Sequence, residues 1–287
     1  MNSNEVQQKW VRAEDIAPKD LAEARLQLHH ALQIVADASR KLGFDGDTEY
    51  VEAAQGLGTE IARGDGPFRV VLGIADFALH ATDRDGKPTA SFPLAGKSYA
   101  DGVAWLRSTL DALGADGAKI TGATPYDIPS HKVADGAPFA PLAPAVWRKL
   151  AAYYGNAWRV LTYLSEITPD CPMPPRCSSE TLAYEARLSP IEDVEIAIGF
   201  RPGDELRDEP FHYVAILPRP RIAEHAVDEL DELEGGGEWA DEDWFGAIQT
   251  GSAYTLYDSE SVQAAAATSF FDSALEQARG LIGLGEE

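Results

Sequence analysis

The stretch Leu182–Phe200, LAYEARLSPIEDVEIAIGF, decides the fold class. Apolar residues alternate with polar or small ones in its first half, and the alternation resumes after the polar segment Ser189–Asp193. A period of two residues is typical of a β-strand with one buried face. Two such runs joined by a short turn predict an antiparallel hairpin, and therefore an antiparallel sheet.

The same two periods recur along the chain. Strand-like alternation is seen at 51–61, 68–74, 77–81, 194–200 and 211–217, with a short strand ending near Leu94 and a last strand or hairpin at 245–256. Apolar residues recur at helical spacing in 20–42, 98–113, 144–164 and 259–283. This order predicts an α+β fold of antiparallel sheets packed with helices, and suggests two pseudo-repeated α–β–α halves.

The sequence predicts a short lead-in followed by one large unit. We expect residues 1–19 to be a disordered or loosely packed lead-in. Residues 20–287 then form one α+β unit, and a division into two subdomains, 20–140 and 141–287, is open. The acidic segment 224–243 contains ten carboxylates and no Lys or Arg, which predicts a solvated excursion.

The charge balance limits the class of partner. The chain has 24 basic and 47 acidic residues, a net charge of −23. Nucleic acid binding depends on Lys and Arg placed on phosphates, so nucleic acid and anionic membrane are not expected partners. No secretory signal and no membrane-spanning run are visible. Two cysteines, Cys171 and Cys177, make no disulfide framework, and we expect free thiols in a cytoplasmic protein. Oligomeric state is not predicted.

Common catalytic motifs are missing from the sequence. It has no P-loop GxxxxGK[ST], no HExxH and no GxSxG. No metal and no cofactor is therefore predicted.

The first helix carries two candidate site residues, His29 and Gln33. One interpretation aims His29 into a pocket as a base or ligand, with Gln33 one turn later fixing its tautomer. The alternative is a pair of helix histidines, His29 and His30, at the edge of the core with local hydrogen bonds. Further on, TPYDIP at 124–129 places Tyr126 and Asp127 at a cleft rim, or simply shapes a loop.

The loop 201–212 carries the other candidates. Arg201 can pair with a substrate carboxylate or phosphate, while Asp204, Glu209 and His212 offer oxygen and nitrogen donors. The alternative is internal pairing of these charges around a bend, with His212 pointing into packing. The stretch 238–245, at the end of the acidic segment, contains two tryptophans, Trp239 and Trp244, which either anchor it or line an apolar pocket.

Together these motifs resemble a bacterial family of uncharacterised proteins about 300 residues long. The resemblance rests on LHxxxQIV at 28–35, GLxT at 56–59, TPYDIP at 124–129, GFRPGDELRDEPFHYV at 199–214 and WFGAI at 244–248. It implies a single unit over the whole chain and supplies no reaction. The family often has a histidine-rich stretch where this chain has Ser178–Ala183, which puts in doubt any activity that depends on those histidines.

Three functional hypotheses follow. The first is binding of a small molecule in a cleft between the helix 20–42 and the loops 201–212 and 239–246, with Trp244 in its lining. The second is a hydrolase or lyase that uses His29 or His212 with Asp204 or Glu209 as an acid–base pair. The third is an interaction module whose acidic 224–243 segment docks on a basic partner. The sequence does not decide whether the protein is an enzyme.

Overall fold

The computed structural model describes residues 1–12, 18–43, 46–61, 67–83, 85–220, 230–241 and 244–283. The chain divides into two compact units. Unit 1 comprises Met1–Ile16, Ala152–Pro175 and Tyr184–Glu287, and unit 2 comprises Ala17–Ala151 and Arg176–Ala183. Helices and antiparallel sheets make up both units, which confirms the predicted α+β class.

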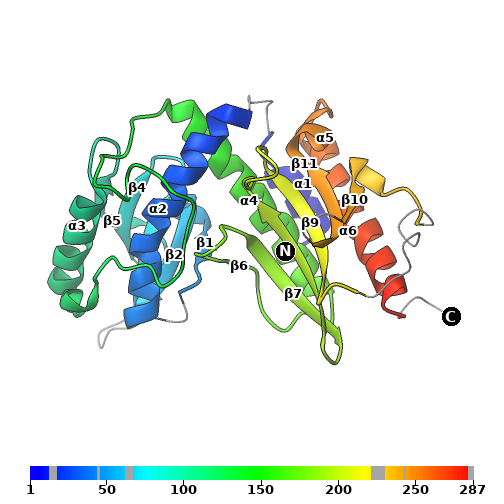
Figure 1. Ribbon diagram of the computed structural model, residues 1–287, viewed down its shortest axis with the longest axis horizontal. Helices are drawn as coiled ribbons and strands as arrows, with labels where there is room; N and C mark the ends of the chain where they lie inside the picture. The colour runs from blue at the N-terminus through cyan, green and yellow to red at the C-terminus, as the bar shows by residue number, and fades with distance from the viewer. Residues whose placement is uncertain are drawn as a thin grey trace. The chain divides into compact units, whose positions relative to one another are not determined.

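Unit 2 is a five-stranded antiparallel sheet with two helices on one face (Figure 1). The strands lie side by side in chain order, β1-β2-β3-β4-β5. The elements are α2 (Pro18–Leu42), β1 (Glu49–Val51), η1 (Glu52–Ala54), β2 (Gly56–Ile61), β3 (Phe68–Gly73), β4 (Ala78–Thr82), β5 (Pro88–Pro93), α3 (Tyr99–Ala112), η2 (Gly117–Lys119), the first part of α4 (Pro144–Ile167) and β6 (Arg176–Cys177).

The core of unit 2 lies between this sheet and helices α2 and α3. Apolar residues of α2 at helical spacing meet alternate residues of the strands. Leu28 and Leu32 of α2, Leu79 of β4 and Leu106 of α3 have no solvent exposure. Burial of such side chains stabilises the unit by roughly 1.5–3 kcal/mol each.

A late segment of the chain returns to unit 2 after α4. Thr48 and Cys177 exchange two backbone hydrogen bonds, of 3.0 and 2.8 Å. Arg176 adds an ion pair to Glu49 at 3.2 Å. These contacts hold Arg176–Ala183 in unit 2, which brings Ser179 next to α2 although about 150 residues separate them in the sequence.

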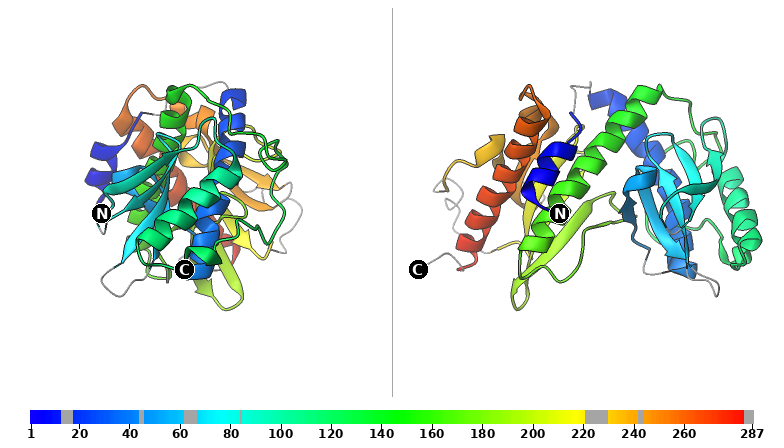
Figure 2. Two further views of the ribbon diagram at one scale, coloured as in Figure 1. Left: turned by 90° about the vertical axis from the view of Figure 1, so that its left-hand side faces the viewer. Right: turned by 180° about the vertical axis from the view of Figure 1, so that it is seen from behind.

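Unit 1 has its own antiparallel sheet, with its strands in the order β10-β11-β9-β8-β7. Helix α6 packs on β9 and β11, and α1 lies beside α6 (Figure 2). The elements are α1 (Ser3–Lys9), the rest of α4, β7 (Tyr184–Ile191), β8 (Val194–Arg201), β9 (Phe211–Leu217), η3 (Glu234–Gly236), β10 (Glu238–Asp241), β11 (Phe245–Thr250), α5 (Gly251–Thr255) and α6 (Glu260–Leu281). The strand order differs from that of unit 2, so the two sheets are not strand-by-strand copies.

Aromatic rings fill the core of unit 1. Phe200 of β8 stacks on Tyr153 and meets Tyr154 edge-on, with ring centroids 6.2 and 5.1 Å apart. His212 of β9 stacks on Tyr254 at 5.3 Å. The α4 residues of this unit and α6 therefore cover the same sheet face, on which Phe200 and His212 are register neighbours.

The structure differs from the sequence predictions in three segments. Ser3–Lys9 forms a capped helix with Val6 buried, where a loose lead-in was expected; residues 13–17 lie outside the described residues. Of the two alternatives for 245–256, the strand is formed over Phe245–Thr250, and the hairpin is not, because the Thr250 side chain caps helix α5. Glu238–Asp241 is an edge strand rather than a solvated excursion. The rest of the predicted 224–243 excursion includes 224–229 and 242–243, which lie outside the described residues.

Across the described ranges, no helix combines the length and apolar character that a membrane crossing requires. Both cysteines are free thiols, as the sequence predicts.

A glycine in unit 1 provides a test of its packing. A Cβ at Gly199 would lie 2.3 Å from Cζ of Tyr213, whose ring is buried. We expect Gly199→Ala to lower the free energy of unfolding by about 1–3 kcal/mol, because the ring must shift in a packed environment. The control is Gly280→Ala in α6, where nothing lies within 4 Å of the new Cβ. Urea unfolding of both variants measures these free energies. A Gly199→Ala variant as stable as Gly280→Ala would contradict the prediction.

Candidate ligand-binding site

A pocket of about 550 Å³ opens in unit 2. One wall is a face of α2, another is the first turn of α3, and the third is the connection that follows η2. Its lining residues are His30, Gln33, Tyr99, Ala100, Gly122, Thr124, Tyr126, Asp127, Ile128, Ser130, Val133, Ala134 and Gly136.

A buried carboxylate ties the connection to α2. Asp37 Oδ2 accepts backbone hydrogen bonds from Thr121 at 2.7 Å and Gly122 at 2.8 Å. The Asp37 side chain is 1% exposed, and Arg40 lies 4.0 Å away one turn further along the helix. Gly122 has φ +74°, which a residue with a side chain rarely adopts, and its carbonyl accepts a hydrogen bond from the Tyr99 hydroxyl at 2.9 Å.

Tyr126 is the centre of a second set of hydrogen bonds. Its hydroxyl donates to Oε1 of Gln33 at 3.1 Å and accepts from Nη1 of Arg40 at 3.4 Å. The Ser179 hydroxyl lies against the same phenolic oxygen. The Arg40 guanidinium also covers the ring, 5.9 Å from its centroid. These contacts hold the TPYDIP segment against α2 at a defined position.

His29 is not among the residues that line the pocket and is buried, 5% exposed. Its Nε2 lies 3.2 Å from the backbone carbonyl of Ser179, which also accepts Nε2 of Gln33 at 2.7 Å. Burial lowers the pKa of His29 to about 4, although the hydrogen bond to Ser179 acts in the opposite direction. The ring is therefore neutral at pH 7, with Nε2–H as the donor. Gln33 bonds the carbonyl of His29 and not its ring, so the tautomer role predicted for Gln33 is wrong.

His30 is the histidine that lines the pocket. Its Nε2 bonds the carbonyl of Pro129 at 3.0 Å, and burial lowers its pKa. A neutral ring with Nε2–H as donor leaves Nδ1 as an acceptor. The ring of His131 lies beside that of His30, with the two ring centroids 5.6 Å apart. Nε2 of His131 is 3.2 Å from Oε1 of Glu23.

The other predicted site residues lie in unit 1. Arg201 and Trp244 both contact the ring of Tyr213, with the guanidinium and the indole each 5.7 Å from its centroid. His212 precedes Tyr213 on β9, so its side chain lies on the opposite face of the sheet, where it is 1% exposed. The structure thus brings Arg201 and Trp244 together and separates His212 from both.

The carboxylates of the 201–212 loop bind the loop's own backbone and its neighbours. Asp204 Oδ1 accepts the N–H groups of Leu206 and Arg207 at 3.0 and 2.8 Å. Glu209 accepts the N–H of Ser252 at 2.6 Å. Arg201 also pairs with Asp204 at 3.7 Å, as the alternative of internal charge pairing around the bend predicts, whereas the partner of Glu209 lies outside the loop.

His212 does not form the predicted acid–base pair with a loop carboxylate. Its Nδ1 is 2.9 Å from Oε1 of Gln249, whose Nε2 donates to the carbonyls of Gly235 and Ala266. Burial lowers the pKa of His212 to about 4. His212 thus bonds Gln249 rather than Asp204 or Glu209, and the hydrolase or lyase hypothesis stays a prediction.

Trp239 anchors the acidic segment. Its Nε1 donates to Gln277 of α6 at 2.9 Å, and its ring stacks on Phe245 at 5.2 Å.

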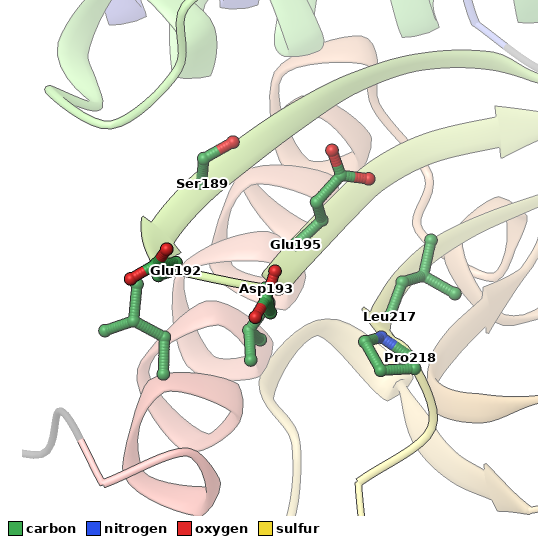
Figure 3. A pocket seen from close by; sticks show the side chains of 8 residues that line it. Ser189, Glu192, Asp193, Glu195, Leu217 and Pro218 are labelled. Atoms are coloured by element: carbon green, nitrogen blue, oxygen red, sulfur yellow. The ribbon is translucent and has the colours of Figure 1, made fainter.

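A second pocket, of about 410 Å³, lies at the β7–β8 turn of unit 1 (Figure 3). Its lining includes the acidic residues Glu192, Asp193 and Glu195, and also Leu217 and Pro218. Glu195 is already paired with Arg187 at 2.7 Å. Within the part of the chain that the structure describes, no group of three or more His, Cys, Asp or Glu side chains is placed to hold a metal ion.

Comparison with known proteins leaves the site to be interpreted from its geometry. No family model, curated protein or solved structure matches the chain. The bacterial family resemblance stays a prediction.

Sequence reasoning identified part of this site. Gln33, Tyr126 and Asp127 were recognised, the last two from the Pro-bracketed TPYDIP segment. His30 and Ser179 were missed as functional positions. His30 was visible as half of the His–His pair, whereas nothing in the sequence around Ser179 indicates a contact with α2.

The buried His29 predicts a pH dependence of stability. Its pKa is about 4 in the folded protein and near 6.5 when unfolded. Between these values the unfolded chain binds more protons, so stability falls as the pH drops from 6.5 to 4. The free energy of unfolding that His29 removes over this pH range is about 3 kcal/mol. We expect His29→Gln to lack it, so that the stability difference from wild type changes with pH in urea unfolding. A difference that stays constant between pH 7 and 4 would count against a neutral, buried His29.

Proposed function

We propose that unit 2 binds a small molecule in the pocket beside α2. The observation that carries the proposal is a concave site of about 550 Å³ whose walls are held by Asp37, Gln33 and Tyr126. Small-molecule sites typically occupy ~300–1,000 Å³ and combine apolar walls with a few fixed polar groups. The proposal keeps the α2 wall of the predicted cleft; the contribution of loops 201–212 and 239–246 stays a prediction.

The lining indicates the class of ligand. Among the described residues that form it, Asp127 is the one carboxylate and none is Lys or Arg. The ring of Tyr99 offers aromatic surface to an apolar or cationic group, whereas Arg40 already covers the ring of Tyr126. His30 contributes a neutral imidazole. A neutral or cationic amphipathic molecule fits these groups, and an anion does not, since the chain also carries a net charge of −23.

The two free thiols fit a reducing compartment, and we include a cytoplasmic location in the proposal.

Three probes of similar size and different charge test the proposal: benzylamine, benzyl alcohol and benzoate. We expect weak binding of the first two and none of benzoate in ligand-observed saturation-transfer NMR. Ala100 lines the pocket on the exposed side of α3. Ala100→Trp should therefore abolish binding. Ala104→Trp, one turn further along the same helix and outside the lining, is the matched control and should bind as wild type does.

Asp127→Asn tests the charge preference separately. Benzylamine should bind about five-fold more weakly, which corresponds to about 1 kcal/mol for an ion pair near the surface. Benzyl alcohol should be unaffected. Equal binding of all three probes, or binding that survives Ala100→Trp, would overturn the proposal.

A further inference from the structure

Three polar side chains of unit 2 form a continuous hydrogen-bonded chain outside the pocket. The hydroxyl Oγ of Ser91 lies 2.8 Å from Nδ1 of His80. Nε2 of His80 lies 3.0 Å from Oδ2 of Asp76 and 3.3 Å from its Oδ1. A serine, a histidine and an aspartate are thus connected in the order that nucleophilic catalysis requires.

Strand register produces this arrangement. Ser91 of β5 and His80 of β4 are direct partners in the antiparallel ladder, so their side chains lie on the same face of the sheet. Leu79 and Ala81, on the opposite face, are fully buried. The triad therefore lies on the sheet face away from α2 and α3.

Gly73 of β3 leaves room for the His80–Asp76 contact. A Cβ there would lie 2.3 Å from Oδ1 of Asp76 and 2.7 Å from Nε2 of His80. Asp76 occupies the tight turn between β3 and β4, where Phe77 adopts φ +47°. The local backbone is thus compatible with the pair only while residue 73 has no side chain.

The hydrogen bonds determine the role of each nitrogen of His80. In the neutral ring, Nε2–H donates to the Asp76 carboxylate, which leaves the lone pair of Nδ1 to accept the Ser91 hydroxyl. His80 is 5% exposed, and Ser91 is solvent-exposed on β5, the last strand of this sheet. The base is shielded, while Ser91 occupies an exposed position.

We propose that Ser91 is a nucleophile toward activated carboxylic esters, with His80 as its general base and Asp76 as the positioning residue. Ser91 Oγ forms a bond to the acyl carbon while its proton passes to Nδ1 of His80. The bond from the acyl carbon to the alcohol oxygen then breaks, and the leaving group takes up that proton; where it departs as an anion, His80 gives the proton to solvent. Water then attacks the acyl carbon while His80 takes its proton, the bond from the acyl carbon to Ser91 Oγ breaks, and Oγ takes back that proton as the carboxylic acid leaves.

The edge of the sheet supplies a donor for the developing oxyanion. Leu94 N–H donates to the Phe77 carbonyl, which marks a hydrogen-bonded pair of the β4–β5 ladder. Hydrogen-bonded and non-hydrogen-bonded pairs alternate along an antiparallel ladder. His80 and Ser91 lie three positions from the Phe77–Leu94 pair, so they form a non-hydrogen-bonded pair. The backbone N–H of Ser91 therefore points away from β4 toward the open edge. A nucleophile's own N–H is a common element of an oxyanion hole.

A fluorophosphonate and p-nitrophenyl acetate test the proposal on the full chain. We expect one covalent phosphonyl adduct per chain, mapped by mass spectrometry to Ser91, with fluoride leaving. Ser91→Ala should lose both the adduct and the esterase activity. Ser108→Ala, which changes an exposed serine of α3, should retain both.

Two more variants assign the roles of the other residues. His80→Gln should lower the esterase rate by about 10²–10⁴-fold, the usual contribution of a general base. Asp76→Asn should cost less, because its side chain is 57% exposed. Ser91 and Asp76 are surface positions, so their variants remain informative if His80→Gln does not fold.

Absence of an adduct, an adduct on another serine, or a Ser91→Ala rate equal to that of wild type would overturn the proposal. An Asp76→Asn variant that is labelled and turns over as fast as wild type would overturn the positioning role of Asp76.

Discussion

The pocket of unit 2 depends on Asp37 of α2, whose carboxylate is buried. An unpaired carboxylate at such a position would cost several kcal/mol, so its burial requires strong hydrogen-bond partners. The N–H groups of Thr121 and Gly122 provide them at 2.7 and 2.8 Å. Charge-assisted bonds of this kind are about twice as strong as neutral ones. The irregular connection after α3 is thereby fixed to the helix at one point.

The other walls of the pocket follow from that attachment. With Gly122 held, its carbonyl receives the Tyr99 hydroxyl, and α3 is joined to the same point. Four residues later Tyr126 contacts Gln33 and Arg40, on the turns of α2 before and after Asp37. A site whose walls are already braced in this way loses less conformational entropy on binding than a flexible loop does. This is the physical basis for proposing binding at α2.

Local patterns in the sequence predicted much of the fold. The helix at 20–42, the alternating strands and the α+β class follow from periods of 3.6 and two residues. TPYDIP was recognisable as an ordered connection, a cleft rim or a shaped loop, because each proline restricts its neighbours. Long-range contacts were not predictable in this way. Ser179 reaches α2 only because Cys177 pairs with Thr48, and Glu238–Asp241 becomes a strand only because β11 is there to pair with it.

The Ser91–His80–Asp76 chain illustrates the same limit. No catalytic motif spans these residues, because their proximity arises from the β4–β5 register and from the space at Gly73. Sequence spacing shows which residues share a strand face, but register between strands is decided by turns and core packing.

Hydrogen exchange of the Thr121 and Gly122 amides tests the central role of Asp37 most directly. The account predicts that both amides are protected in the wild-type protein and that Asp37→Ala removes this protection, while the amides of β3 keep theirs. Wild-type amides at 121 and 122 that exchange as fast as those of an open loop would contradict it.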